Sequence, residues 1–253
     1  MRSGFMTDAL KIDELKVFLK SNQPVNTKEL LHFYQQFVPT LKINTLRWRI
    51  YELKKLDIIY SPQRGFYALQ EKKKFIPSAT ELIETISKSV QDRFPYAKFS
   101  IFSTQWLTNF SNHMYQSKNI ILEVEIDVID AVFHFLNEEF PNVFLLPDQK
   151  MYDYYISPQQ ENIIITRLYV DAPLSQIEGS YYIPRLEKLL VDLVINTPVI
   201  LPISQSEIKT IITNVLEVYN INYSTLSRYA KKRGIEKRLV EFNLSKGEEK
   251  NDI

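Results

Sequence analysis

Residues 45–69, TLRWRIYELKKLDIIYSPQRGFYAL, change from one periodicity to another part-way along. Leu46, Ile50, Leu53 and Leu56 recur at helical spacing, which places them on one face of a helix. Two β-rich segments follow, Ile58 to Tyr60 and Phe66 to Leu69, on either side of the turn sequence SPQRG. A proline and a glycine in that turn predict that the two segments pair as a hairpin. The stretch therefore predicts a helix followed directly by a β-hairpin.

Two further helical patterns precede this stretch, over residues 8–20 and 28–37, and Pro24 and Pro39 follow them. We expect Thr27 to cap the second helix and Asn44 to cap the third. Three helices and a hairpin within residues 1–70 are the order of a winged helix-turn-helix DNA-binding domain. Residues 71–77, EKKKFIP, are charged and end in proline, so we expect a linker there.

The rest of the chain alternates between helical and strand patterns. Residues 78–205 predict an α/β domain, because strand patterns are interleaved with helical ones. Residues 206–253 predict a helical, basic C-terminal region, with one helix over residues 224–242 and a disordered tail from Ser245. The predicted fold class is α+β: an N-terminal winged helix-turn-helix, then an α/β body and a helical C-terminal region.

Charge is distributed unevenly along the 253 residues, although the net charge is only +1. Residues 1–74 hold 14 Lys and Arg against 7 Asp and Glu, residues 75–224 hold 9 against 18, and residues 225–253 hold 8 against 5. A basic N-terminal region favours a polyanionic partner for that region. The chain has no cysteine, no apolar run of membrane-spanning length and no signal-peptide pattern, so we expect a cytoplasmic protein without a membrane partner.

The helical wheel of residues 44–55 identifies candidate DNA contacts. Because the apolar face points inward, Asn44, Trp48, Tyr51 and Lys55 point outward and Arg47 lies on a flank. In a winged helix this helix enters the major groove, where arginine reads guanine and asparagine reads adenine. The expected backbone contacts are Lys28, Lys42 and Lys55, with Arg64 at the tip of the hairpin. Winged helices also serve as protein-docking modules, so Trp48 and Tyr51 could equally contact a protein.

The sequence resembles a known family at several places. The pattern Trp48-Arg49-x-Tyr51-x-Leu53, then Ile58-Ile59 and Arg64-Gly65-Phe66-Tyr67, resembles the winged helix of AbiEi-type antitoxins of type IV toxin-antitoxin, or abortive infection, systems. YYIPRLEKLLVDLV at residues 181–194 and LSRYAKKRG at residues 226–234 are similar to later segments of that family.

The resemblance implies a transcriptional autoregulator that binds double-stranded operator DNA and counteracts a nucleotidyltransferase-like toxin. It implies operator contacts from the helix residues Asn44, Thr45, Arg47, Trp48, Arg49, Tyr51 and Lys55, and from Arg64. It also implies a second surface, for a partner or for nucleic acid, formed by Arg228, Lys231, Lys232, Arg233, Lys237 and Arg238. The alternative for these last cations is an ordinary solvated helix face.

An enzymatic alternative rests on acidic residues in the body. Glu123, Glu125 and Asp127 alternate along a predicted strand, and carboxylates so spaced hold metal ions in nucleotidyltransferases. The same alternation also fits a half-buried strand with one wet face. The glycine-serine turn of that enzyme class is absent upstream, as are phosphate loops and a GxSxG motif. We therefore expect a binding protein, not an enzyme, with no cofactor or metal.

A nucleotidyltransferase-like enzyme with an attached winged helix and a winged-helix docking adaptor remain the alternatives. The helical pattern near residue 190 adds two local expectations. Glu187 and Lys188 should form its exposed side, and Asp192, which interrupts the apolar face, should be hydrogen-bonded or lie at an interface.

Overall fold

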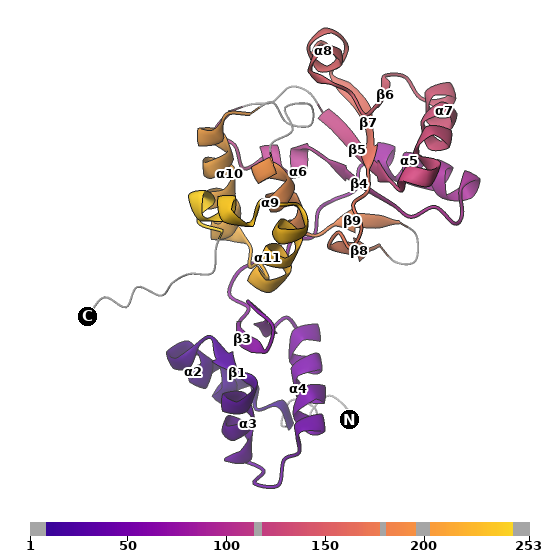
Figure 1. Ribbon diagram of the computed structural model, residues 1–253. Helices are drawn as coiled ribbons and strands as arrows, with labels where there is room; N and C mark the ends of the chain where they lie inside the picture. The colour runs from indigo at the N-terminus through magenta and orange to yellow at the C-terminus, as the bar shows by residue number, and fades with distance from the viewer. Residues whose placement is uncertain (1–8, 114–117, 178–180, 196–202, 245–253) are drawn as a thin grey trace. The chain divides into compact units, whose positions relative to one another are not determined.

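The structure is a computed structural model that describes residues 9–113, 118–177, 181–195 and 203–244. The chain divides into two compact units (Figure 1). Unit 1 consists of residues 1–74 and 218–224, and unit 2 consists of residues 75–217 and 225–253. The first boundary, after Lys74, falls within the stretch 71–77 expected as a linker. The C-terminal region expected from residue 206 onward is not a unit of its own, and the expected disordered tail from Ser245 lies outside the described residues.

In its described residues, unit 1 contains the helices α2, α3 and α4 and a small antiparallel sheet whose strands run in the order β1-β3-β2. Val25 in β1 pairs with Tyr67 in β3, and Ile59 in β2 pairs with Leu69 in β3. The sequence patterns missed β1 because it is only two residues long. The elements are α2 (Ile12–Asn22), β1 (Val25–Asn26), α3 (Thr27–Gln35), α4 (Ile43–Lys55), β2 (Ile59–Tyr60) and β3 (Phe66–Leu69).

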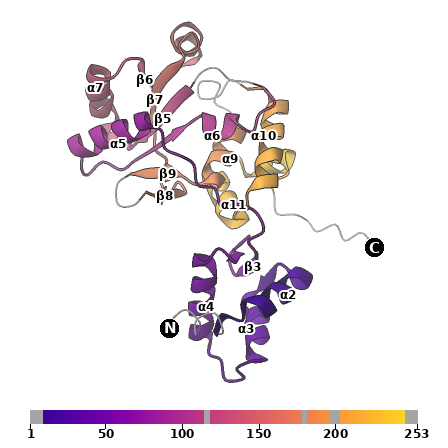
Figure 2. The same cartoon turned by 180° about the vertical axis from the view of Figure 1, so that it is seen from behind.

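The core of unit 1 confirms the predicted inner face of α4. Leu46, Ile50 and Leu53 are all buried, in a cluster that includes Leu30 and Tyr34 of α3. Leu56, expected on the same face, is exposed because α4 ends at Lys55 and Leu56 is its C-cap. In unit 1, α2 and α4 lie on opposite sides of α3 (Figures 1 and 2).

Both helix caps expected from the sequence are wrong. Asn26, not Thr27, caps α3: its side chain accepts hydrogen bonds from the backbone N–H groups of Lys28 and Glu29, and the Glu29 carboxylate accepts from the Asn26 N–H. This reciprocal capping box satisfies donors that the first turn leaves open. Asn44 lies inside α4, which begins one residue earlier.

The turn between β2 and β3 is fixed by residues 222–224, which belong to the later segment of unit 1, residues 218–224. The Tyr223 N–H donates to the Pro62 carbonyl at 2.7 Å, and the Arg64 N–H donates to the Ser224 hydroxyl at 3.0 Å. The side-chain amide of Asn222 donates to the Ser61 backbone carbonyl at 2.7 Å. These bonds occupy the backbone of the turn, so the exposed Arg64 side chain is the part of the tip that remains available for a ligand.

Unit 2 is built on a six-stranded mixed sheet with strand order β6-β7-β5-β4-β9-β8. Strands β5, β6 and β7 are parallel to one another, whereas β4 is antiparallel to β5 and parallel to β9. The carboxyl ends of β5 and β7 therefore meet at one edge of the sheet. The strands are β4 (Phe99–Ser103), β5 (Lys118–Val124), β6 (Val143–Leu145), β7 (Glu161–Arg167), β8 (Leu174–Gln176) and β9 (Tyr182–Pro184).

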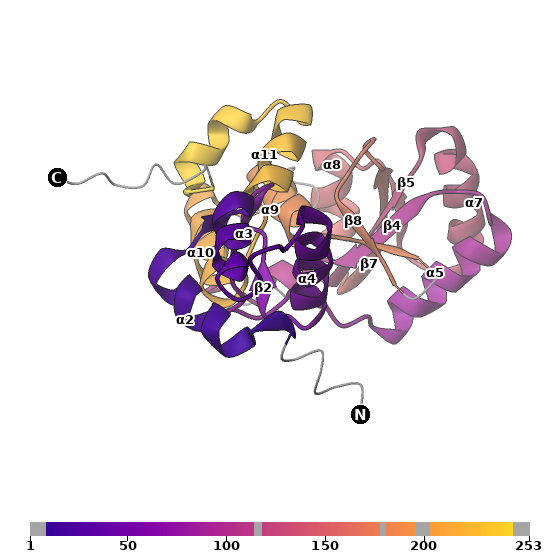
Figure 3. The ribbon, with the colours of Figure 1, turned by 90° about the horizontal axis from the view of Figure 1, so that it is seen from below.

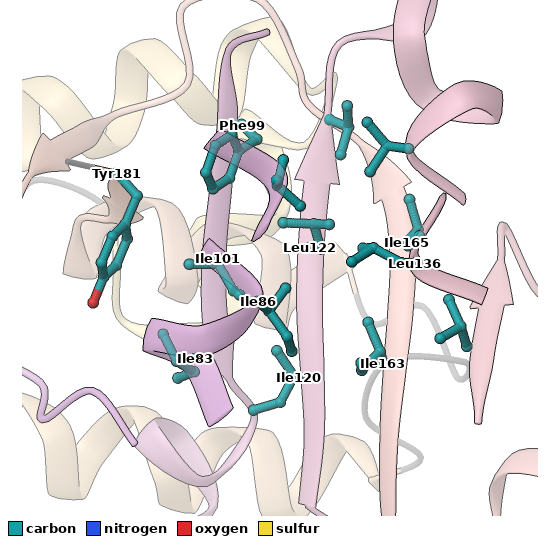
Figure 4. Packing of buried hydrophobic residues seen from close by; sticks show 14 of the residues in the cluster. Ile83, Ile86, Phe99, Ile101, Ile120, Leu122, Leu136, Ile163, Ile165 and Tyr181 are labelled. Carbon is teal, nitrogen blue, oxygen red and sulfur yellow. The ribbon is translucent and has the colours of Figure 1, made fainter. Parts of the chain in front are cut away.

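Helices cover both faces of this sheet: α5 and α7 lie on one face, and α9, α10 and α11 on the other (Figures 1, 2 and 3). The α5 and α7 face is packed with aliphatic side chains such as Ile86, Ile101, Leu122 and Ile165 (Figure 4). Because both faces are covered, β4 is buried along its whole length and β5 from Asn119 onward. The single wet face expected for β5 is therefore wrong.

The remaining elements of unit 2 are mostly helical. They are α5 (Glu81–Arg93), α6 (Gln105–Thr108), a 3-10 turn (Ile126–Val128), α7 (Ile129–Glu139), α8 (Gln149–Met151) with a π-turn (Tyr152–Ile156), α9 (Leu186–Ile195), α10 (Gln205–Val218), α11 (Tyr223–Lys232) and a 3-10 helix (Glu236–Phe242). The chain thus has a mixed α/β fold with a helical C-terminal region. Among the described residues, no helix is long and apolar enough to cross a membrane.

The last helical segment is interrupted, contrary to the single helix expected over residues 224–242. Gly234 adopts a left-handed conformation with φ of 71°, and the Ile235 N–H bonds back to the Ala230 carbonyl. A glycine in this conformation ends a helix because it has no Cβ to clash. The chain therefore turns after α11, and a short 3-10 helix follows.

Candidate nucleic-acid interface

The outer face of α4 gathers most of the predicted DNA contacts of unit 1. Asn44, Arg47 and Lys55 are exposed, and so are the two aromatic residues, Trp48 at 43% and Tyr51 at 62%. These positions lie opposite the buried Leu46, Ile50 and Leu53 because α4 is a regular amphipathic helix. The result is a polar and aromatic surface along the helix.

The first turns of α4 bring two predicted base-reading side chains together. The Arg47 guanidinium donates to the side-chain oxygen Oδ1 of Asn44 at 3.4 Å, since residues three apart are neighbours on a helix. Thr45 is exposed beside them. Arginine and asparagine side chains are the ones that pair bidentately with guanine and adenine edges.

Arg49 is the exception among the predicted contacts on α4, because it is buried. Only 6% of the residue is exposed, and its guanidinium lies over the Tyr34 ring, 4.5 Å from the ring centroid. Its Nε and Nη1 atoms are buried without a hydrogen-bond partner among the described residues, and burial lowers the pKa of the guanidinium. The signal was present in the sequence: positions 46, 49, 50 and 53 share one face of a helix.

Three other predicted contacts of unit 1 lie outside the outer face of α4. Lys28 is exposed in the first turn of α3, and Lys42 is exposed at the N-cap of α4. Arg64 is exposed at the turn between β2 and β3. All three cations are thus accessible to an anionic partner.

The predicted cations of the C-terminal region do not form one uniform surface in unit 2. Arg228, Lys231 and Lys237 are exposed, but Lys232 forms an ion pair with Asp171, and Arg238 is half-buried. The Arg233 side chain is only 13% exposed and is bound to acidic and aromatic groups. A ligand could therefore reach only part of the predicted set directly.

Arg233 belongs to a buried network of charges that the sequence patterns did not predict. The ammonium of Lys188 donates to Glu123 Oε1 at 2.5 Å and to Asp192 Oδ2 at 2.6 Å. Asp192 Oδ1 accepts from Arg233 Nη1 at 2.5 Å and from the Tyr229 hydroxyl at 3.2 Å. The hydrogen-bonded Asp192 is confirmed. Lys188, expected on the exposed side of α9, is fully buried, and so is most of its neighbour Glu187.

The pKa shifts in this network follow from burial and from neighbouring charges. Burial works to lower the pKa of Lys188, but Asp192 and Glu123 together outweigh it, so the pKa of the ammonium is raised. The pKa of the Glu123 carboxyl is raised, chiefly by burial and also by Asp192, although Lys188 acts to lower it. The local sequence signal for this network was Lys188 and Asp192, four residues apart on an otherwise apolar helix.

The three carboxylates of the enzymatic alternative do not converge. Glu123 faces α9 from the end of β5, Glu125 follows the strand and accepts a hydrogen bond from the Lys98 N–H at 3.0 Å, and Asp127 lies in the 3-10 turn. The expectation that they project from one strand to one face is wrong, because β5 ends at Val124. Within the described residues there is no group of three or more acidic or histidine side chains able to hold a metal ion.

Residues 45–249 match a protein family described as "Family of unknown function (DUF6577)". The chain belongs to this family. The matched region begins at α4 and includes the β2-β3 hairpin and the buried network, but leaves out α2 and α3. The family's description assigns it no activity.

Comparisons with individual proteins add little. No curated protein matches the chain. A solved structure, the crystal structure of RV2827C protein from Mycobacterium tuberculosis, is 14% identical, with 93% of this chain and 82% of that chain covered. Its TM-score is 0.23, so this match supports no inference about fold or function.

Proposed function

We propose that unit 1 is a winged helix-turn-helix domain that binds double-stranded operator DNA through the outer face of α4. The observation that carries this proposal is the exposed set Asn44, Arg47, Trp48, Tyr51 and Lys55 on one face of one helix. A solvated helix does not need two exposed aromatic residues between cationic ones. Aromatic residues can contact sugars and thymine methyl groups, and the cations favour phosphate.

The order of elements in unit 1 supports the winged-helix part of the proposal. A helix, a short strand, two helices and a two-stranded hairpin follow one another, and the first strand pairs with the last. In such a domain the third helix enters the major groove, and the hairpin is the wing beside it. Here these parts are α4 and the β2-β3 hairpin with Arg64 at its tip.

The proposed contacts divide into two classes. Asn44 and Arg47 read base edges, and their mutual hydrogen bond orders both side chains before DNA binds. Lys28, Lys42 and Lys55 contact phosphates and set the register of α4 in the groove. Arg64 contacts the backbone or the neighbouring minor groove.

The proposed biological role is that of a cytoplasmic autorepressor and antitoxin of a type IV toxin-antitoxin system. The sequence resemblance to AbiEi-type antitoxins supports this role, together with a basic N-terminal region joined to an acidic body. The toxin would be a nucleotidyltransferase-like protein, and direct binding, competition for substrate and repression alone are the possible means of opposing it.

The experiment is a fluorescence-anisotropy titration of the full-length protein with labelled DNA from upstream of its own coding sequence and with a scrambled duplex, at two salt concentrations. We expect sequence-dependent binding that weakens as salt increases, because phosphate contacts release counterions. Arg47→Ala should cost about 1–3 kcal/mol at one base position, while Lys55→Ala should weaken binding to both duplexes and reduce the salt dependence.

Lys20→Ala is the matched control, because it removes one exposed charge from α2, across α3 from α4 (Figures 1 and 2). It should leave DNA affinity nearly unchanged. An equal loss for Lys20→Ala and Arg47→Ala would contradict recognition through α4. Absence of binding to both duplexes would contradict the proposal and would leave Trp48 and Tyr51 as a docking surface for a protein.

A further inference from the structure

Unit 2 contains a pocket of 320 Å³ lined by Tyr169, Val170, Tyr229, Lys232 and Arg233. Tyr169 and Val170 follow the carboxyl end of β7, and the other three residues lie on α11 or directly after it. Open α/β sheets bind ligands beyond the carboxyl ends of their parallel strands. The pocket occupies such a place, and its volume is at the lower end of the range for small-ligand sites.

Arg233 presents a specific hydrogen-bonding edge at this pocket. Its Nη1 atom is occupied by Asp192 and by the Tyr229 hydroxyl, at 2.5 and 2.8 Å. Its Nε and Nη2 atoms have no hydrogen-bond partner among the described residues, and neither belongs to the fully buried atoms that lack one. These two atoms form the side edge of the guanidinium, which binds the oxygens of a phosphate or carboxylate in parallel.

The guanidinium is held in place before any ligand binds. Its central carbon lies 3.7 Å from the centroid of the Tyr169 ring, and Asp192 fixes the opposite side of the group. Asp192 is in turn held by Lys188, which is fully buried. An arginine fixed in this way loses little side-chain entropy on binding an anion.

We propose that this pocket binds the phosphate group of a small phosphorylated molecule that also carries a ring, such as a nucleoside monophosphate. The Nε and Nη2 edge of Arg233 holds the phosphate, and Lys232 adds a second cation. The exposed part of Tyr169 contacts the ring. The inference does not depend on the DNA-binding function proposed for unit 1.

The charge balance favours a single phosphate over a nucleic-acid backbone. Lys232 is already paired with Asp171, and Arg233 with Asp192, so the pocket has little net charge. Unit 2, which contains the pocket, carries 23 acidic against 17 basic side chains, and this acidic excess repels an extended polyanion. A single phosphate held by two fixed donors carries less charge than a nucleic-acid backbone, so it meets less of that repulsion.

The test is a titration of the full-length protein into AMP and into inorganic phosphate, followed by phosphorus NMR, with adenosine, followed by its proton NMR signals, as the phosphate-free control. We expect a shift or broadening of both phosphorus signals, competition between the two ligands, and weaker or absent binding of adenosine. Arg233→Lys keeps the charge but removes the paired donors, so it should weaken AMP binding at least about tenfold.

Two other variants keep the result interpretable if Arg233→Lys fails to fold. Lys232→Gln changes an exposed side chain and should weaken AMP binding severalfold, whereas Lys237→Ala removes an exposed cation that does not line the pocket and should have no effect. Unchanged signals for AMP and phosphate up to about 10 mM would overturn the proposal. Binding that survives both Arg233→Lys and Lys232→Gln would overturn it as well.

A binding experiment with double-stranded DNA distinguishes the ligand of this pocket from the DNA site proposed for unit 1. DNA that competes with AMP in the wild-type protein, and loses affinity with Arg233→Lys, would assign the pocket to a nucleic-acid backbone and refute the small-molecule ligand. DNA binding that is lost with Arg47→Ala but kept with Arg233→Lys would leave the two sites independent.

Discussion

Replacing Lys188 by methionine should destabilise unit 2 strongly, because the ammonium is the shared partner of two carboxylates. Methionine keeps the length of the side chain, so packing changes little. Asp192 keeps its bonds to Arg233 and Tyr229, but Glu123 loses the ammonium, and its other oxygen is already buried without a partner among the described residues. Breaking a buried pair by removing one partner costs about 3–5 kcal/mol.

A separate estimate from protonation agrees with this cost. Without Lys188, burial raises the pKa of the Glu123 carboxyl further, so this group should take up a proton in the folded state. Neutralising a glutamate of ordinary pKa at pH 7 costs about 1.4 kcal/mol for each pH unit above that pKa, or roughly 3–4 kcal/mol in all.

The estimate also fixes a pH dependence for the Lys188→Met variant. Its folded state would hold one more proton than its unfolded state above the ordinary glutamate pKa of 4.5, because burial raises the pKa of Glu123 and Lys188 no longer lowers it. The free energy of unfolding then falls as pH rises, by about 1.4 kcal/mol per unit. The free energy of unfolding of the variant should therefore rise by roughly 2–3 kcal/mol between pH 7 and pH 5 through this carboxyl.

The chain offers a suitable probe for this measurement. It has two tryptophans, Trp48 in unit 1 and Trp106 in unit 2, and Trp106 packs against the core of the sheet. In a Trp48→Phe background, urea unfolding followed by tryptophan fluorescence reports on unit 2. Lys88→Met, at an exposed site on α5, is the matched control and should change stability by less than about 0.5 kcal/mol.

A double variant tests the mechanism. Adding Glu123→Gln to Lys188→Met removes the titrating carboxyl, so the pH dependence should disappear and part of the lost stability should return. A loss below about 1 kcal/mol in the free energy of unfolding for Lys188→Met at pH 7 would contradict the claim that removing Lys188 leaves a costly unpaired carboxylate at Glu123. A pH dependence between pH 5 and pH 7 that is the same in Lys188→Met and in the double variant would contradict the protonation of Glu123.

Two further predictions concern other parts of the chain. Arg49→Met should leave the stability of unit 1 unchanged or raise its free energy of unfolding by up to about 2 kcal/mol, because two buried nitrogens without partners are removed. Unfolding followed by Trp48 fluorescence in a Trp106→Phe background measures this change. A loss of stability of more than about 2 kcal/mol would mean that the contact with Tyr34 dominates. A hydrogen bond from Ser111 lowers the pKa of Glu207 below 4.5, so the free energy of unfolding of the wild-type protein should fall as pH decreases through and below 4.5. Glu207→Gln should reduce this pH dependence in acid unfolding curves. An equal pH dependence in both proteins would contradict this role for Glu207.

Local sequence patterns predicted the elements whose own residues decide them. Most of the inner face of α4 was predicted because Leu46, Ile50 and Leu53 repeat at helical spacing, and α9 was predicted from the helical pattern near residue 190. The β2-β3 hairpin was predicted from its turn residues. Elements of two or three residues, such as β1, were missed because so short a segment has no periodicity.

Charged residues were predicted less well than apolar ones. Glu123 was expected to face water, yet it lies under α9, which covers the second face of the sheet. Arg49 was expected among the operator contacts, yet it is buried against the ring of Tyr34. In both cases the partner comes from another part of the chain, so the charged residue's own segment gives no sign of it.

The amino-acid sequence by itself determined the amphipathic helices, the hairpin and the uneven distribution of charge, because these depend on residues within a few positions of one another. Only the tertiary structure decided which charges are buried. Lys188 and Glu123 are 65 residues apart, and they meet because α9 packs across the sheet at β5. An ion so deeply buried is stable only beside an opposite charge, and the folded chain alone brings the two together.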